Sequence, residues 1–184
     1  NFARLAKDGK LIAIEPLPQF HAVLNHFIGQ RENVELHNVA LGKEAGSITM
    51  VLPQTNGMLR TGLPHIMRPE EKTTLERTQE VQMVNTSDFF STFERIDYIK
   101  CDIEGHEWEV FQLLVHVLEE KRPIVQLEID PKNEPHLFHF FNELNYVRCG
   151  LNGLICKIET DKHYGGDYLF IPSEKQQLIT KWNA

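Results

Sequence analysis

Three acidic residues and a glycine follow an apolar segment near the middle of the chain. Acidic side chains of this kind can bind a ligand or accept a proton during catalysis. The segment 96–103 predicts a parallel strand that helices cover on both faces. Asp102, Glu104 and Glu107 stand where this strand gives way to a loop, and Gly105 permits a sharp turn or the close approach of a ligand. Because ligands of open α/β sheets bind beyond the carboxyl ends of the strands, we expect a site here. Glu107 fits equally well the first turn of a helix, where the helix dipole favours acids.

Size and composition limit the classes to which the protein can belong. With 184 residues, 41% of them hydrophobic, the sequence predicts a single domain over residues 1–184 with a sizeable core. The formal net charge of -7 argues against a broad surface for nucleic acid or anionic lipid. No apolar run approaches the roughly 18 residues of a transmembrane helix. We therefore expect neither a nucleic-acid partner nor a membrane partner.

The cysteines and histidines lack the spacing of a metal site. Cys101, Cys149 and Cys156 form no Cys-x-x-Cys pair, and their odd number favours reduced thiols in a cytoplasmic protein. His136 and His139 are three residues apart on a predicted helix, without an acid or cysteine at the spacing of metal ligands. From these residues we expect no metal.

Helical and strand patterns alternate along the chain in the order of a doubly wound α/β sheet. The first half predicts helix 2–7, strand 10–15, helix 19–28, strand 33–41, and strands 47–52 and 80–85 paired at a sheet edge. The second half predicts helix 89–93, the acidic strand, a helix from about 108 to 120, strand 123–129, helix 136–144, and strands 146–150, 154–158 and 167–172. Of these last strands, 146–150 and 167–172 are expected to form an antiparallel pair at the far edge.

Residues 54–78 contain glycines, prolines and little periodicity, so we expect a long loop. Long loops in compact domains are usually functional, and this one is the candidate substrate loop. Arg60, His65 and Arg68 within it could meet an anionic acceptor, although an ordinary solvated loop would carry such charges too. The expected edge strands 47–52 and 80–85 would permit a homodimer.

Polar side chains end four of the predicted strands. Glu15, Asp102 and Glu128 end three of them, and Asn38 ends a fourth. In a parallel sheet these ends lie along one edge. A carboxylate there can accept hydrogen bonds from both ribose hydroxyls of a nucleotide cofactor, so Glu15 is the first candidate for a ligand contact. The alternative is an acid in a surface turn that the following prolines stiffen.

Three segments of the chain resemble the FkbM-type methyltransferases. They are Ile14-Glu15-Pro16-x-Pro18, Asn38-Val39-Ala40-Leu41-Gly42 and Ile99-Lys100-Cys101-Asp102-Ile103-Glu104-Gly105-His106-Glu107. The third is quite specific, and the similarity extends over nearly the whole chain. The resemblance implies a Rossmann-like, mostly parallel sheet with an antiparallel edge hairpin. It also implies an S-adenosylmethionine-dependent enzyme that methylates a hydroxyl of a small molecule or sugar.

The resemblance further implies roles for individual residues. Those implied to bind the cofactor are Glu15, Pro16, Asn38, Val39, Ala40 and Asp102. Those implied in catalysis are Asp102, Glu104 and His106, and those on the substrate side are Glu107 and Glu128. Glu15 would hold the ribose, Asn38 would lie beside the adenine, and Ala40 would leave room for its ring. Asp102 or Glu104 could take the proton of the acceptor hydroxyl, with Glu128 or His106 as further candidates.

The glycine-rich loop of the family and the first strand of its sheet are expected upstream of Asn1. The chain opens in the helix that should follow them. Cofactor binding is therefore expected of a longer protein, since this loop lets the backbone approach the cofactor closely.

Three other functions remain open. An NAD-dependent oxidoreductase would use Glu15 in the same way, but hydride transfer does not need so many acids. A non-catalytic binding or scaffold domain would keep the fold without the chemistry. Alternatively, Asp102, Glu104 and Glu128 could bind a divalent cation, because oxygen ligands suit magnesium.

Overall fold

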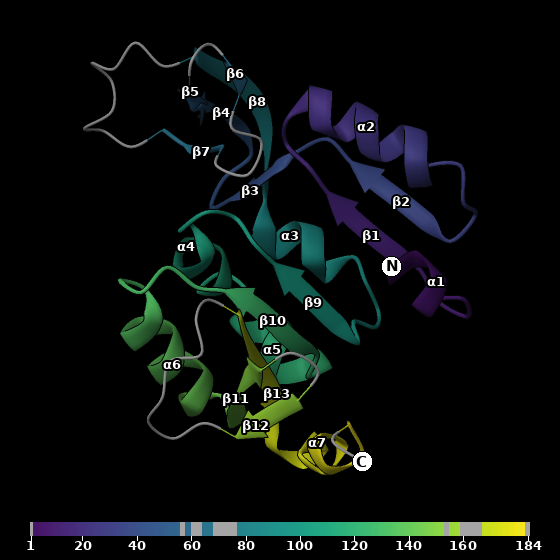
Figure 1. Ribbon diagram of the computed structural model, residues 1–184, viewed down its shortest axis with the longest axis vertical. Coiled ribbons are helices and arrows are strands. Elements are labelled where there is room, and N and C mark those ends of the chain that lie inside the picture. The colour runs from purple at the N-terminus through teal and green to yellow at the C-terminus, as the bar shows by residue number, and fades with distance from the viewer. Residues whose placement is uncertain are drawn as a thin grey trace. The chain divides into compact units, whose positions relative to one another are not determined.

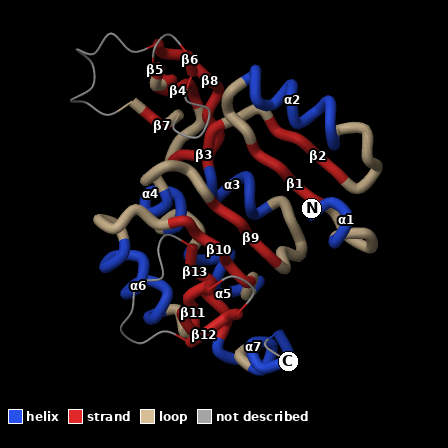
Figure 2. Tube along the Cα trace, viewed as in Figure 1, coloured by secondary structure: helices blue, strands red, loops and turns tan. Residues whose placement is uncertain are grey.

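The structure is a computed structural model that describes residues 2–55, 58–59, 64–67, 77–152, 155–158 and 167–182. Two compact units, Asn1–Thr86 and Ser87–Ala184, make up the chain, and each is described by itself. Figure 1 labels their helices and strands, and Figure 2 distinguishes the two kinds of element by colour. None of the helices within the described ranges has the length and apolar character needed to cross a membrane.

The first unit combines a parallel pair of strands with a mixed sheet. Its elements are α1 (Phe2–Leu5), β1 (Leu11–Ile14), α2 (Pro18–Ile28), β2 (Val34–His37), β3 (Ala40–Gly42), β4 (Gly46–Leu52), β5 (Gln54–Thr55), β6 (Met58–Leu59), β7 (His65–Ile66) and β8 (Arg77–Asn85). β1 pairs with β2 in parallel. The mixed sheet has the order β3-β8-β4-β7, in which β3–β8 is parallel and the other pairings are antiparallel.

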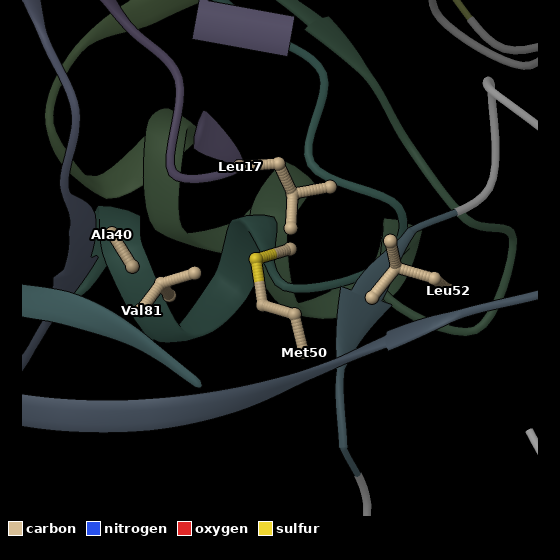
Figure 3. Close-up of a cluster of buried hydrophobic side chains, with 5 residues drawn as sticks. All are labelled: Leu17, Ala40, Met50, Leu52 and Val81. Atoms are coloured by element: carbon tan, nitrogen blue, oxygen red, sulfur yellow. The ribbon is translucent and has the colours of Figure 1, made fainter. Parts of the chain in front are cut away.

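A hydrophobic cluster fastens the turn after β1 to the mixed sheet (Figure 3). Its buried members are Leu17, Ala40, Met50, Leu52 and Val81. Met50 and Leu52 share one face of β4 because strand side chains alternate between faces. Burying a leucine side chain in this way contributes roughly 1.5–3 kcal/mol. The cluster therefore determines where the chain runs between β1 and α2.

The second unit is built on one mixed sheet. Its elements are α3 (Thr86–Ser91), which starts on the last residue of the first unit, β9 (Tyr98–Cys101), α4 (Glu107–Phe111), α5 (Val115–Lys121), β10 (Ile124–Glu128), α6 (Glu134–Glu143), β11 (Tyr146–Asn152), β12 (Ile155–Ile158), β13 (Asp167–Pro172), the 3-10 helix η2 (Ser173–Lys175) and α7 (Gln177–Trp182). Among described residues the strand order is β12-β11-β13-β10-β9, with β9–β10 parallel and the rest antiparallel.

Helices pack on the apolar faces of this sheet. On one face, the ring of Phe141 from α6 stacks on Phe170 from β13, with centroids 4.0 Å apart. On the other, Ile179 from α7 packs with Leu169 and Ile171 of the same strand. Because neighbouring residues of β13 point to opposite faces, this one strand contributes to both cores.

The structure confirms the mixed α/β class and most of the expected elements. Strands 47–52 and 80–85 pair antiparallel as β4 and β8, and 146–150 pairs antiparallel with 167–172 as β11 and β13. The expected position of this second pair at the far edge is wrong, because β12 forms that edge and β13 lies between β11 and β10. Of the described strand pairings, three are parallel and six are antiparallel. A mostly parallel, doubly wound sheet over one domain therefore stays a prediction.

Two expected elements are divided in the structure. The prediction of a single strand over residues 33–41 is wrong. The chain leaves the pairing of β1 with β2 at Asn38 and continues as β3, which belongs to another sheet. The prediction of a single helix from 108 to 120 is also wrong, because the structure has two helices, α4 and α5. Between them the N–H of Leu113 donates to the carbonyl of Val110, and the N–H of Leu114 donates to the carbonyl of Phe111. Such three-residue hydrogen bonds are typical of helix ends.

The strands on which a homodimer was expected each have a neighbour along part of their outer side. β8 lies between β3 and β4, and β4 lies between β8 and β7. Among described residues β3 pairs only with Met83–Asn85 of β8, and β7 pairs only with Met50 and Val51 of β4, so each neighbour covers part of its strand. The homodimer stays a prediction.

One arginine joins three segments of the second unit. The guanidinium of Arg122 forms two hydrogen bonds with the carboxylate of Glu174, each of 2.9 Å. It also donates to the carbonyls of Leu144 and Asn145, at 2.8 and 3.1 Å. Its side chain lies over the ring of Tyr146, 4.6 Å from the centroid. Arg122 thus ties the end of α5 to the α6–β11 turn and to η2.

Replacing this arginine should destabilise the protein. We expect Arg122→Ala to lower the free energy of unfolding by about 2 kcal/mol, because two backbone carbonyls lose a charged donor while the exposed Glu174 pair adds little. Urea unfolding measures the change. Arg95→Ala is the matched control, since its pair with Asp97 is 82% and 68% exposed and should matter by less than about 0.5 kcal/mol. Equal effects of both substitutions would contradict the proposed tie.

Candidate functional site

The carboxylate of Glu15 stands directly after β1. The N–H of Glu15 donates to the carbonyl of His37 at 3.0 Å, which extends the pairing with β2 by one residue. Its Oε1 accepts a hydrogen bond of 2.9 Å from the N–H of Leu17. Partial burial raises the pKa of Glu15, against the lowering effects of the Leu17 N–H and of nearby His21. One carboxylate oxygen therefore orders the turn, and among described residues no hydrogen bond occupies the other.

The side chain of Asn38 fixes the backbone of this turn. Its Nδ2 donates to the carbonyl of Glu15 at 2.8 Å and to that of Pro16 at 2.9 Å. The turn after β1 is thus held by the residue that follows β2. An amide that bridges two neighbouring carbonyls gives the turn one conformation, and this aims the Glu15 carboxylate.

Ala40 lies in the hydrophobic cluster of Figure 3, and its side chain is 5% exposed. Close packing against Leu17 and Val81 accounts for a small side chain at this position. Val39, which precedes it, and Pro16 are both half-buried. The contacts of these residues with a cofactor stay predictions.

Two acids lie side by side at the carboxyl ends of β9 and β10. The parallel register places Leu127 opposite Cys101, so Asp102 and Glu128 are the next pair along the two strands. The Nζ of Lys100 lies 3.3 Å from the Oδ2 of Asp102. The charge of Asp102 is the main cause that raises the pKa of Glu128, with burial and the charge of Asp167 adding to it. Glu128 thus holds a proton more readily than an isolated carboxylate does.

A third acid, Asp167, completes this edge of the sheet. Antiparallel pairing places it opposite Glu128, because β13 begins where β10 ends. The Nε2 of Gln126 donates to the Oδ1 of Asp167 at 3.2 Å, and the hydroxyl of Tyr98 donates to the Oε1 of Gln126. Burial raises the pKa of Tyr98 to about 12, so its hydroxyl remains a donor. A polar network therefore crosses three strands, from Tyr98 to the acids.

The loop after Asp102 contains a tight turn. Glu104 has φ 53° and Gly105 has φ 89°, which are left-handed conformations. A residue with a side chain pays about 1–2 kcal/mol for this conformation, whereas glycine does not. The Glu104 side chain is exposed. The turn directs this carboxylate away from the core at the end of β9.

Glu107 is 1% exposed, and its buried side chain binds the backbone of this turn. Its Oε1 accepts a hydrogen bond of 2.9 Å from the N–H of Gly105. This position matches the alternative of an acid in the first turn of a helix, since Glu107 opens α4. A role of Glu107 on the substrate side stays a prediction.

His106 is half-buried beside α4. Its Nδ1 lies 3.5 Å from the Oε2 of Glu109, one turn further along. Burial lowers the pKa of His106, although Glu109 and Glu107 act in the opposite direction. The ring is therefore held against its own helix, and its burial disfavours the protonated form.

The structure brings together the residues within each unit. Glu15, Asn38 and Ala40 belong to the first unit, and Asp102, Glu104 and Glu128 to the second. Their meeting at one edge of a continuous sheet stays a prediction. Within the described ranges, no group of three or more His, Cys, Asp or Glu side chains could hold a metal ion. The described parts of the candidate substrate loop 54–78 contain the short strands β5, β6 and β7, with His65 of β7 opposite Val51, while Arg60 and Arg68 lie outside the described residues. A contact of this segment with substrate stays a prediction.

Sequence reasoning missed three residues of these clusters. The position of Asp167 could have been inferred from the sequence, because a strand that pairs antiparallel with β10 begins at the edge of the sheet where β10 ends. The sequence also contains a weak indication for His21, since this residue lies in the first turns of the helix that follows Glu15. Asn133, which donates from Nδ2 to the carbonyl of Gly105 at 3.0 Å, had none, because 28 residues separate it from the turn that it binds.

Comparison with known proteins shows which family the chain resembles. The family model of the Methyltransferase FkbM domain matches residues 1–152. The crystal structure of methyltransferase FkbM from Methylobacillus flagellatus KT shares the fold, with a TM-score of 0.50 and 14% sequence identity. That match covers 88% of this chain and 36% of the other, so the chain spans about a third of that protein. No curated protein matches the sequence. Because the domain match extends over most of its length, the chain belongs to the FkbM methyltransferase domain family.

Proposed function

We propose that the protein uses S-adenosylmethionine to methylate a hydroxyl group on a small molecule or sugar. The observation that carries this proposal is the pair of acids Asp102 and Glu128 at the ends of two parallel strands, in a chain of this methyltransferase family. Ligands of α/β sheets bind beyond such strand ends. The acids supply what an acceptor hydroxyl needs, which is a group that orients it and takes its proton.

The turn after β1 suits the ribose of the cofactor. Glu15 keeps one carboxylate oxygen for a ribose hydroxyl, while Oε1 and the Asn38 amide hold the turn in place. A preformed acceptor of this kind loses little entropy when the ligand binds. Burial strengthens the bond further, because the hydroxyl meets a carboxylate that water does not fully solvate.

Asp102 and Glu128 would share the work of a base. In the proposed reaction, the acceptor oxygen forms a bond to the methyl carbon while the carbon–sulfur bond breaks and the sulfur keeps the electron pair. The bound S-adenosylmethionine supplies the activated methyl group. The acceptor proton passes to a carboxylate of the pair. A base works best when its pKa lies nearer the working pH, and Asp102 moves the pKa of Glu128 in that direction.

Binding of S-adenosylhomocysteine tests the cofactor class. Calorimetric titration into the full-length protein should show binding, whereas NAD in a parallel titration should not bind. Binding of NAD alone would point instead to an oxidoreductase. Binding of neither molecule would favour a non-catalytic domain.

The role of Glu15 can be tested in the same titration. We expect Glu15→Gln and Glu15→Ala to weaken S-adenosylhomocysteine binding by about 1–3 kcal/mol, or roughly five- to 150-fold, because charge-assisted hydrogen bonds are lost. Glu15→Gln retains an acceptor for the Leu17 N–H and separates the ligand contact from folding. The exposed Glu32→Ala of the same unit is the control. Wild-type affinity in both Glu15 variants would remove this residue from the cofactor site.

The acid pair predicts a shift in a titration. We expect Asp102→Asn to lower the pKa of Glu128 towards its ordinary value of 4.5, because ionisation of Glu128 then no longer opposes a neighbouring negative charge. Carbon-13 NMR of the side-chain carboxyl groups measures the pKa directly. Glu109→Gln, an exposed acid on α4, should leave it unchanged. An unaltered pKa of Glu128 in Asp102→Asn would show that the two carboxyls are not coupled.

A further inference from the structure

Two backbone contacts fasten the turn at Glu104 and Gly105, one on each side of the same residue. The N–H of Gly105 donates to Oε1 of Glu107 at 2.9 Å. The carbonyl of Gly105 accepts a hydrogen bond from Nδ2 of Asn133 at 3.0 Å. Gly105 is therefore held at both its polar groups, and neither can rotate without breaking a bond.

The Asn133 contact is unusual for the position of this residue. Asn133 is the N-cap of α6, where asparagine commonly uses its side-chain oxygen to accept a hydrogen bond from the helix. Here the side chain makes no such capping bond. Instead its amide reaches the β9–α4 loop, 28 residues earlier in the sequence. The residue thus links the loops that follow the parallel strands β9 and β10.

Glu107 contributes a buried partner for the same turn. Its side chain is 1% exposed, and one oxygen binds Gly105 while Oε2 has no hydrogen-bond partner among described residues. A buried carboxylate is costly unless it is well bonded. The bond to the Gly105 N–H is the contact that offsets part of this cost, and it ties the buried side chain to the turn.

The turn itself holds Glu104 in a left-handed conformation that an acid does not favour. Such backbone strain tends to persist where surrounding contacts impose it, and it gathers at functional sites. A simple connection from β9 to α4 would be satisfied by glycine or asparagine at this position. The contacts of Asn133 and Glu107 keep an acid there instead.

We propose that Asn133 is a positioning residue which, together with Glu107, preforms the Glu104–Gly105 turn beside Asp102, where the turn bounds the proposed ligand site at the ends of β9 and β10. This inference rests on the proposed function. Without the Asn133 bond, the turn spends more time in other conformations, and the binding-competent fraction falls. Apparent affinity decreases by that same fraction.

Asn133→Ala removes the bond and tests the proposal in the full-length protein. We expect the affinity for S-adenosylhomocysteine to fall by up to five-fold, because one neutral hydrogen bond shifts the conformational equilibrium of the turn by about that factor. The amide of Gly105 should exchange its hydrogen about five-fold faster, as measured by NMR. Asn133→Asp should behave like Asn133→Ala, because aspartate caps a helix as well as asparagine but cannot donate to the Gly105 carbonyl.

Asn142→Ala is the matched control, since this exposed asparagine lies on the same helix. It should leave both the affinity and the exchange rate unchanged. A second variant, Glu104→Gly, should raise the urea midpoint or leave it unchanged, because glycine adopts the left-handed conformation without strain. A clearly lower midpoint would overturn the argument from strain.

The two readouts separate this proposal from the proposed function. If wild-type protein binds S-adenosylhomocysteine and Asn133→Ala binds it equally well, the positioning role is wrong although the cofactor class stands. If Asn133→Asp restores affinity, the residue acts by capping α6 and the proposal is also wrong. Unchanged exchange of the Gly105 amide in Asn133→Ala would show that the bond does not hold the turn. Failure of the wild-type protein to bind would overturn the proposed function first.

Discussion

Parallel pairing of β9 and β10 is the constraint on which the acid cluster depends. With Leu127 opposite Cys101, the residues that follow these strands, Asp102 and Glu128, must lie next to each other. In an antiparallel pair the same residues would lie at opposite ends of the sheet. The raised pKa of Glu128 follows directly from this register, because its main cause is the neighbouring charge of Asp102. One backbone pairing thus sets the electrostatics of the proposed site.

The same edge shows how polar groups survive beside an apolar core. Residues of β13 alternate between faces, so Tyr168 and Phe170 pack on one side while Leu169 and Ile171 pack on the other. Asp167 opens this strand at the edge, where the apolar packing ends. The acids are therefore held by well-packed strands yet remain near solvent. Catalytic groups on rigid strand ends are positioned more reliably than groups on long loops.

Short side-chain ties position the two loops that matter most. Asn38 bridges the carbonyls of Glu15 and Pro16 in the first unit, and Asn133 binds the carbonyl of Gly105 in the second. In each case an asparagine from a later loop restrains an earlier one. Asparagine suits this task because its amide donates two hydrogen bonds and carries no charge that must be desolvated. The proposed site is thus shaped by neutral contacts around its charged residues.

The sequence by itself determined the α/β class, the order of most elements and the acids at the strand ends. These features follow from local periodicity and from residue type, which are visible along the chain. It did not indicate that strand 33–41 would break at Asn38, or that α4 and α5 would separate. Only the tertiary structure decided that Glu107 is buried under a turn, that Asp167 faces Glu128 and that Asn133 holds Gly105. These are contacts between residues whose partners are chosen by packing and register, and local pattern carries no record of that choice.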